Sequence, residues 1–143
     1  MKTEYVDGIQ LLRPYIDEDN REFWEAHKEN KLVFQTCANC GQMIHRPRPM
    51  CPYCLATEKK WVESTGIGTV YSWVVFVYDR AAYPGIKVPY IVVLVEMAEG
   101  PRVISNMEGV EPEDMYVGMP VEVFFEKIDE DLTLPKFKKR KVN

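Results

Sequence analysis

The residues in this chain best suited to chemistry are its four cysteines, which form two Cys-x-x-Cys pairs separated by ten residues. Cys37 pairs with Cys40, and Cys51 pairs with Cys54. A two-residue spacer lets both sulfurs of a pair reach one ion, and Gly41 can take the positive φ of a tight turn after Cys40. Two such pairs supply four thiolates to one tetrahedral metal. The spacing therefore predicts a structural Zn²⁺ site, closed by four ligands and without an open position for metal catalysis.

Three other uses of these cysteines compete with zinc. Residues 51–54 read CPYC, the signature of glutaredoxin-type thiol oxidoreductases, but that chemistry needs a single pair at the start of a helix in a βαβ unit. Two disulfides would suit an exported chain, whereas this chain begins without a basic, apolar leader. Iron in a rubredoxin-like centre uses the same four thiolates. The doubled pair and the absence of a βαβ pattern favour zinc.

Composition and charge limit the class of protein. The chain has 143 residues and is 46% hydrophobic, enough for one ordinary domain or two very small ones. Its longest apolar runs, 71–78 and 88–95, are too short to span a bilayer. The net charge of −4 is uneven, because residues 31–62 form a positive island between two acidic parts. We expect a cytoplasmic protein that does not enter a membrane.

The first thirty residues are predicted to be an arm followed by a helix. Residues 17–30 carry acidic residues in the first turn and then helix formers. Phe23 and Trp24 are too few apolar residues to give this helix a core of its own. Two docking places remain open for these aromatics, the ribbon or another protein. His27 is expected to be a surface or packing histidine.

Residues 31–62 are predicted to form a zinc ribbon, in which a strand, two Cys-x-x-Cys turns and a return strand surround the metal. Each Cys-x-x-Cys turn is called a knuckle below. Such a small unit has almost no hydrophobic core, so the metal replaces one. Arg46 and Arg48, in the HRPRP segment between the knuckles, are candidates for contacting an acidic partner or the phosphates of coenzyme A. His45 is expected to be an exposed loop residue.

From residue 63 to 143 the pattern changes to strands. Alternating or continuous apolar runs without a long helix are typical of a small closed barrel, and a five-stranded OB-fold fits the number of strands. In the first strand, regular alternation would place Val70 and Val74 on one face. The predicted strands are residues 64–80, 90–97, 102–107, 120–128 and the segment that begins with LTLPKF.

The basic tail, KFKKRK at residues 136–141, has two interpretations. The first is a solvated, frayed terminus, and the second is a contact with an anionic partner, either nucleic acid or a phosphorylated cofactor. A basic tail and a basic ribbon also raise nucleic-acid binding as an alternative function, since zinc ribbons and OB-folds both serve it. The net charge of −4 over residues 63–143 argues against this alternative.

Several motifs along the chain resemble one known family. They are the paired cysteines with PxPxCPxC, SxGxGxVYS at 64–72, PY with EGPR at 89–102, GMPV at 118–121 and LPKF at 134–137. From about residue 18 onward the chain resembles the acyl-CoA-associated family catalogued as domain of unknown function 35. That family has a rubredoxin-like zinc ribbon followed by an OB-fold.

The resemblance implies a function as well as a fold. It implies a non-catalytic accessory subunit that binds a thiolase-superfamily enzyme and supports its acyl-CoA chemistry through the complex. It carries over Cys37, Cys40, Cys51 and Cys54 as zinc ligands and carries over no catalytic residue. Phe23, Trp24, Arg46 and Arg48 are candidates for contacts with the partner or with coenzyme A.

Overall fold

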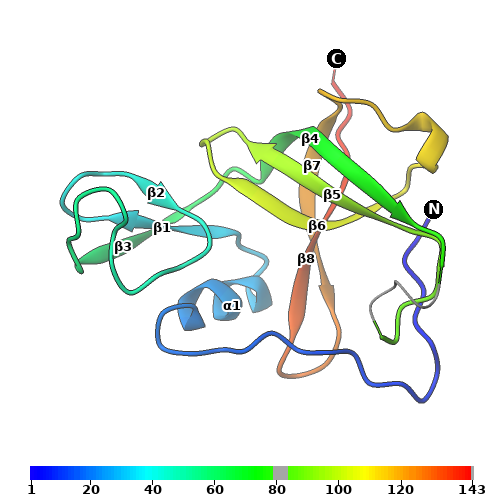
Figure 1. Ribbon diagram of the computed structural model, residues 1–143, viewed down its shortest axis with the longest axis horizontal. Coiled ribbons are helices and arrows are strands. Elements are labelled where there is room, and N and C mark those ends of the chain that lie inside the picture. Colours follow the sequence, from blue (N-terminus) through cyan, green and yellow to red (C-terminus); the bar gives the residue numbers. More distant parts are fainter. Residues whose placement is uncertain (79–83, 143) are drawn as a thin grey trace.

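The fold is mainly β, with one short helix, and the computed structural model describes residues 1–78 and 84–142. Figure 1 shows the ribbon at one end of the molecule, the barrel at the other, and the helix below their junction. The ribbon is a three-stranded sheet in the order β2-β1-β3. Its elements and the helix before it are α1 (Arg21–Lys28), β1 (Val33–Cys37), β2 (Met43–Ile44) and β3 (Lys59–Glu63).

The second sheet is a closed five-stranded barrel in the order β4-β5-β6-β8-β7. This arrangement confirms the predicted OB-fold. One pair, β6 with β8, is parallel, whereas the sequence suggested antiparallel neighbours throughout. The strands are β4 (Ile67–Phe76), β5 (Tyr90–Met97), β6 (Arg102–Glu108), β7 (Pro120–Lys127) and β8 (Thr133–Lys139), with the 3₁₀ turn η2 (Pro112–Asp114) between β6 and β7. Residues 79–83, assigned from sequence to the end of the first strand and the following loop, lie outside the described residues.

A bulge in β4 overturns the predicted alternation of its side chains. The register against β5 shifts between Val70 and Ser72. An extra residue in one strand moves every later side chain to the other face. Val70 is therefore 1% exposed inside the barrel, whereas Val74 is 54% exposed outside it.

The helix is shorter than the sequence pattern suggested and begins after a polar turn. The Asp17 carboxylate accepts hydrogen bonds from the backbone amides of Asp19 and Asn20, at 2.9 and 3.1 Å. These bonds hold the segment outside the helix, which starts at Arg21. Hydrogen bonds from Asp and Asn side chains to nearby backbone groups compete in this way with the backbone hydrogen bonds of a helix.

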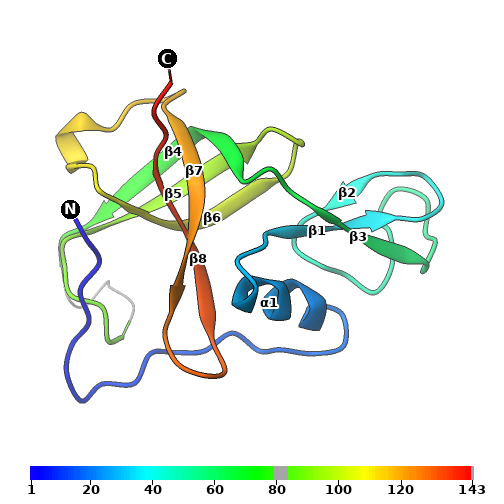
Figure 2. The same ribbon diagram turned by 180° about the vertical axis from the view of Figure 1, so that it is seen from behind.

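One continuous core joins the helix, the ribbon and the barrel. Phe23 of α1 and Phe34 of β1 belong to the same buried cluster as Val70, Val93 and other inward-facing barrel residues. The helix contacts β1 on the ribbon side and β7 and β8 on the barrel side. Figure 2 shows α1 from behind, below β1 and beside β8. The ribbon is therefore held to the barrel by packing as well as by the chain connection.

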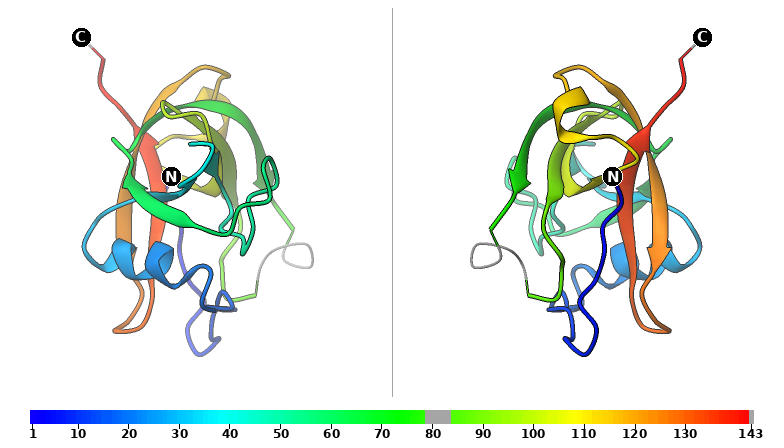
Figure 3. Two further views of the ribbon diagram at one scale, coloured as in Figure 1. Left: turned by 90° about the vertical axis from the view of Figure 1, so that its left-hand side faces the viewer. Right: turned by 90° about the vertical axis from the view of Figure 1, so that its right-hand side faces the viewer.

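The N-terminal arm, residues 1–16, is irregular but attached to the barrel along its length. It runs as the blue segment from the far side of the barrel to α1 in Figures 1 and 3. Tyr5 bridges to Ile86, and the backbone amide of Val6 donates to the Gly85 carbonyl at 2.9 Å. The arm thus covers part of the barrel near the start of β5.

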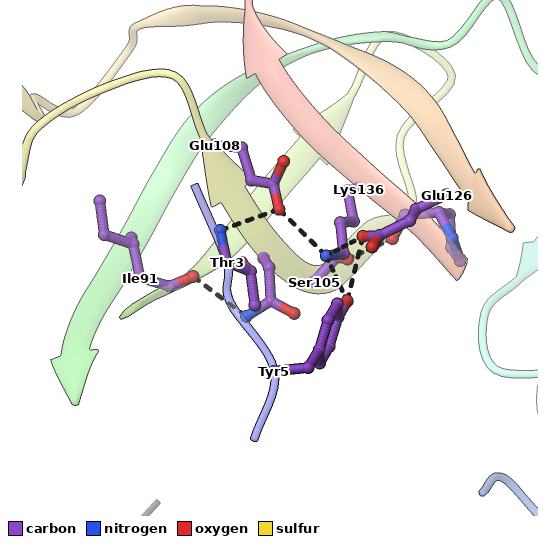
Figure 4. A network of polar contacts seen from close by, with 9 residues as sticks. Thr3, Tyr5, Ile91, Ser105, Glu108, Glu126 and Lys136 are labelled. Carbon is purple, nitrogen blue, oxygen red and sulfur yellow. Dashed lines mark hydrogen bonds and ion pairs between the residues drawn. The ribbon is translucent and has the colours of Figure 1, made fainter. Parts of the chain in front are cut away.

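The basic tail is largely not a frayed terminus, because β8 includes residues up to Lys139. Lys136 is 1% exposed. Its ammonium group lies 3.0 Å from a Glu108 carboxylate oxygen and 2.8 Å from the Tyr5 hydroxyl, and it also pairs with Glu126. The backbone amide of Thr3 donates to the same Glu108 oxygen at 3.1 Å, as Figure 4 shows. Both interpretations of the tail are wrong for Lys136, which contacts internal carboxylates.

Candidate metal centre and neighbouring grooves

The two knuckles bring the four cysteine sulfurs together at the end of the ribbon. β1 ends at Cys37, and all four Sγ atoms lie within 4.8 Å of one another. The backbone amide of Gly41 donates to the Cys37 carbonyl at 3.0 Å, and the amide of Leu55 donates to the Cys51 carbonyl at 2.9 Å. Each knuckle is therefore a tight turn that points both sulfurs to one side.

The sulfur separations match a tetrahedral metal site. Cys37 Sγ lies 3.5 Å from Cys54 Sγ, and Cys40 Sγ lies 3.7 Å from Cys51 Sγ. Four sulfurs at about 2.3 Å from Zn²⁺ would be about 3.8 Å apart along each tetrahedral edge. A disulfide would need about 2.0 Å, and the cysteines are free. The donor set therefore fits Zn²⁺.

The electrostatics of the four thiols also suit a divalent cation. The Asn39 side-chain amide, 3.4 Å from Cys54 Sγ, lowers the pKa of Cys54 to about 6. The Cys40 amide donates to Cys37 and lowers its pKa. At Cys40 the Gln42 amide lowers the pKa, but burial and the neighbouring sulfurs outweigh it and raise the value to about 12. Four thiolates repel one another, and a bound cation reverses that penalty.

Two residues in the knuckles were missed by the sequence analysis. Leu55 has a φ of 66° directly after the second pair, just as Gly41 has a φ of 77° after the first. No glycine signals this position, so only the repeat of the knuckle pattern could have predicted it. Asn39, the sulfur-bonding amide, sits inside the first pair, where any polar residue would fit the motif.

The segment between the knuckles is held by a buried glutamine. Gln35 is 2% exposed; its side chain donates to the Arg48 carbonyl at 2.9 Å and accepts from the Arg48 amide at 2.7 Å. The side chains of Arg46 and Arg48 remain exposed. This exposure is what the predicted contact with a partner or with coenzyme A requires. Arg48 borders a groove of about 710 Å³ between the ribbon and the β5–β6 turn, which also contains Glu99.

His45 does not lie exposed in the loop. It is partly buried, with its ring 5.3 Å from that of Phe23 and 5.7 Å from that of Phe34. Burial, together with the nearby charge of Arg46, lowers the pKa of His45 to about 4. The imidazole is therefore an uncharged packing group between helix and ribbon.

The aromatic residues of α1 pack mainly within this chain. Phe23 is 6% exposed, so it is not a free contact for a partner. Trp24 is half-buried and borders an open surface. His27 is 0% exposed, with its ring 4.5 Å from that of Phe23 and 5.6 Å from that of Phe125. Of the two docking places, the structure selects the ribbon for Phe23, whose ring lies 5.3 Å from that of His45, and α1 also contacts the barrel strands β7 and β8, which the sequence did not indicate.

Together, the ribbon with its four clustered sulfurs and the barrel define a zinc-ribbon OB-fold protein. Comparison with known families finds two matches: the rubredoxin-like zinc ribbon domain of ChsH2 over residues 24–59, and the C-terminal OB-fold domain of ChsH2 over residues 61–126. A DUF35 domain-containing scaffold protein of Methanocaldococcus jannaschii is 34% identical over 110 residues, covering 76% of this chain and 77% of that protein. The chain belongs to the DUF35 family.

Two further relatives extend the comparison. A probable enoyl-CoA hydratase alpha subunit of Thermomonospora curvata is 40% identical over 137 residues, covering 96% of this chain and 42% of that protein. The chain spans about two fifths of the length of the hydratase subunits it matches. A solved structure titled Ltp2-ChsH2(DUF35) aldolase is 40% identical, with a TM-score of 0.82, covering 89% of this chain and 98% of the matched one.

The relatives are therefore named as scaffold proteins, as alpha subunits of hydratases or, with Ltp2, as an aldolase. Within the described ranges, residues 1–78 and 84–142, no helix is long and apolar enough to cross a membrane.

Proposed function

We propose that this chain is a zinc-containing, non-catalytic accessory subunit that binds and supports a thiolase-superfamily enzyme in the cytoplasm. The observation that carries the proposal is the match to the Ltp2-ChsH2(DUF35) aldolase, because it covers 98% of the matched chain at 40% identity. Hydratase activity is not part of the proposal, because the chain covers only 42% and 36% of the hydratase subunits.

In this proposal Zn²⁺ is structural. Cys37, Cys40, Cys51 and Cys54 would hold it, and four thiolates would complete its coordination shell. The metal would supply folding free energy to the ribbon and no chemistry to the reaction. The ribbon then keeps Arg46 and Arg48 in place through the Gln35 clamp.

The two arginines are proposed to meet an acidic surface of the partner or the phosphates of its acyl-CoA. Both are exposed. Replacing both with alanine should weaken acyl-CoA binding by the complex or weaken the complex itself, with the loss greatest at low salt. The double variant Lys138→Ala with Lys139→Ala, at two exposed positions on the barrel, is the matched control for the loss of two positive charges. Unchanged affinities in the double variant would remove the arginines from the proposal.

The proposal is tested by isolating tagged protein from its host at low salt and identifying what co-purifies. A stoichiometric thiolase-superfamily protein is expected. That protein should then be produced with and without this chain, and its thiolysis, condensation or retro-aldol activity compared. Full activity and stability of the enzyme without this chain would overturn the accessory role.

The nucleic-acid alternative is weakened, because one of the five basic residues of the tail is not available to a nucleic acid. Lys136 of the basic tail points to internal carboxylates, and the ligand face of the barrel has the apolar lining described below. A single-strand groove should instead be positive, with exposed stacking aromatics. No observation now favours that alternative over an enzyme-associated role.

A further inference from the structure

Two cavities adjoin each other on the outer face of β5 and β6. One has a volume of about 450 Å³ and lies between this face and the N-terminal arm. The other has a volume of about 580 Å³ and lies between the same face, α1 and the Arg46–Pro47 segment. They share Pro14, Trp24, Ile104, Ser105, Asn106 and Leu134. Because these six residues border both, the cavities form one elongated site.

The arm half of this site is built for an apolar group. Its lining includes Leu11, Leu12, Phe76, Val92 and Leu134, together with the Tyr90 ring stacked 5.1 Å from Phe76. Ligand cavities of about 300–1,000 Å³ with a mostly apolar lining and a few polar groups are typical of small-molecule sites. The second and third strands of an OB-fold are also its usual ligand face. Both the chemistry and the position of this half therefore suit a ligand.

Two polar side chains of β6, which border both cavities, are already oriented. Ser105 Oγ donates to the Pro135 carbonyl, and Asn106 Nδ2 donates to the Ile91 carbonyl at 3.3 Å. These bonds fix the two side chains on β6 between the apolar half and the half next to the ribbon.

The ribbon half ends at a positive charge. Arg46 lines it, and among the described residues Arg46 makes no ion pair. The described lining of the two cavities contains no carboxylate, although the chain as a whole has 22 acidic and 18 basic residues. The groove next to Arg48, by contrast, contains Glu99. An anion is therefore favoured at Arg46 over Arg48.

We infer that this chain itself binds an apolar carboxylic acid whose carboxylate lies near Arg46, with the hydrocarbon under the N-terminal arm against β5 and β6. The inference rests on the proposed function for the natural source of the ligand, the free acid of an acyl group that the partner enzyme handles. The position of the site rests only on the residues that line it. Because the N-terminal arm forms one wall, the arm takes part in ligand binding.

The test titrates the zinc-loaded chain, without any partner, with hexanoate, octanoate and decanoate and with the matching alcohols, by calorimetry. Each additional buried methylene pair should tighten the dissociation constant about tenfold or more, at about fourfold for each methylene. Carboxylates should bind about threefold to fivefold tighter than alcohols at low salt, and Arg46→Gln should remove that preference. No dependence on chain length, or a preference kept in Arg46→Gln, would overturn the assignment.

Two variants locate the site. Ile104→Glu and Leu12→Glu introduce a charge at exposed positions on opposite walls, 57% exposed in both cases, so folding should persist. Each should weaken decanoate binding at least about tenfold. Val117→Glu, at a position 69% exposed and outside both cavities, is the control and should bind as the wild type does. Wild-type binding by both wall variants would overturn the proposal. Since no partner is present, this result is independent of the co-purification.

Discussion

The hydroxyl of Tyr5 accepts a hydrogen bond at 2.8 Å from the ammonium group of Lys136, which lies 131 residues later in the sequence. The same hydroxyl donates to Glu126 at 3.0 Å. Burial disfavours the charged form of Lys136, but the hydrogen bonds to Glu126, Tyr5 and Glu108 raise its pKa. The N-terminal arm and the last strand are thus joined by a buried, charged network.

Replacing Lys136 with methionine should strongly destabilise the fold. The substitution keeps the length of the side chain but leaves Glu108 and Glu126 without their cation. Breaking a buried pair from one side costs about 3–5 kcal/mol. Urea denaturation of the wild type and of Lys136→Met measures this loss.

The control for that experiment is Lys138→Met on the same strand. Lys138 is about half exposed and lies 3.8 Å from Glu122, so its loss should cost about 1 kcal/mol or less. Equal losses in the two variants would mean that the buried network contributes no more than a surface ion pair.

Acid should weaken the junction of helix, ribbon and barrel through His27. Burial lowers its pKa to about 4, partly opposed by the backbone of Thr133, and neither ring nitrogen has a hydrogen bond of normal geometry among the described residues. The unfolded chain, with a pKa near 6.5, takes up the proton first as the pH falls. Stability is therefore complete above about pH 6.5 and declines toward pH 4, by on the order of 3 kcal/mol from this residue.

The measurement is the free energy of unfolding from pH 7 to pH 4 for the wild type and for His27→Phe. Phenylalanine fits an aromatic cluster and cannot be protonated, so the decline should be smaller by the contribution of His27. His45, whose pKa is also lowered to about 4, keeps part of the decline in both proteins. An identical pH profile for the two proteins would contradict the role of His27.

Removing the metal should affect the barrel as well as the ribbon. Leu32 and Phe34 precede the first knuckle and belong to the core that includes the barrel strands. Chelation or Cys54→Ser should therefore lower the melting temperature by more than about 10 °C, because zinc binding contributes folding free energy. The measurement is thermal unfolding together with the zinc content, expected to be one ion per chain.

The control is Ala38→Ser, an exposed substitution inside the first knuckle that leaves all four cysteines in place and should keep both zinc and stability. A colourless protein is expected, whereas iron bound by four thiolates would absorb visible light. Full barrel stability after loss of zinc would show that the shared core does not transmit the change.

Leu55→Gly should stabilise the ribbon slightly. Leu55 has a φ of 66° and is 68% exposed. The steric cost of its left-handed backbone conformation is therefore not offset by packing of the side chain. Glycine adopts this conformation without the Cβ penalty of about 1–2 kcal/mol, offset by about 0.5–1 kcal/mol of entropy. Leu55→Val, with a β-branched side chain, should destabilise it. Competition with a zinc chelator would rank the three proteins, and a reversed order would contradict the argument.

The limits of sequence-based prediction are visible in two strands. The strand near residues 90–97 was placed correctly, because its apolar run needs only local chemistry. The side-chain directions in β4 were wrong beyond Ser72, because a bulge has no signal in the alternation of apolar residues. The burial of Lys136 was missed because its partners come from β6, β7 and the arm.

The sequence by itself determined the four-cysteine cluster, the order of ribbon and barrel, and the family. Each of these depends on residue types at short, fixed spacings, which local geometry converts into a turn or a strand. Only the tertiary structure decided that Phe23 and His27 pack inside the chain, that Lys136 is an internal cation, and that the arm and Arg46 border one cavity. These relationships join residues far apart in the chain, and burial, which changes both packing and pKa, exists only once those segments meet.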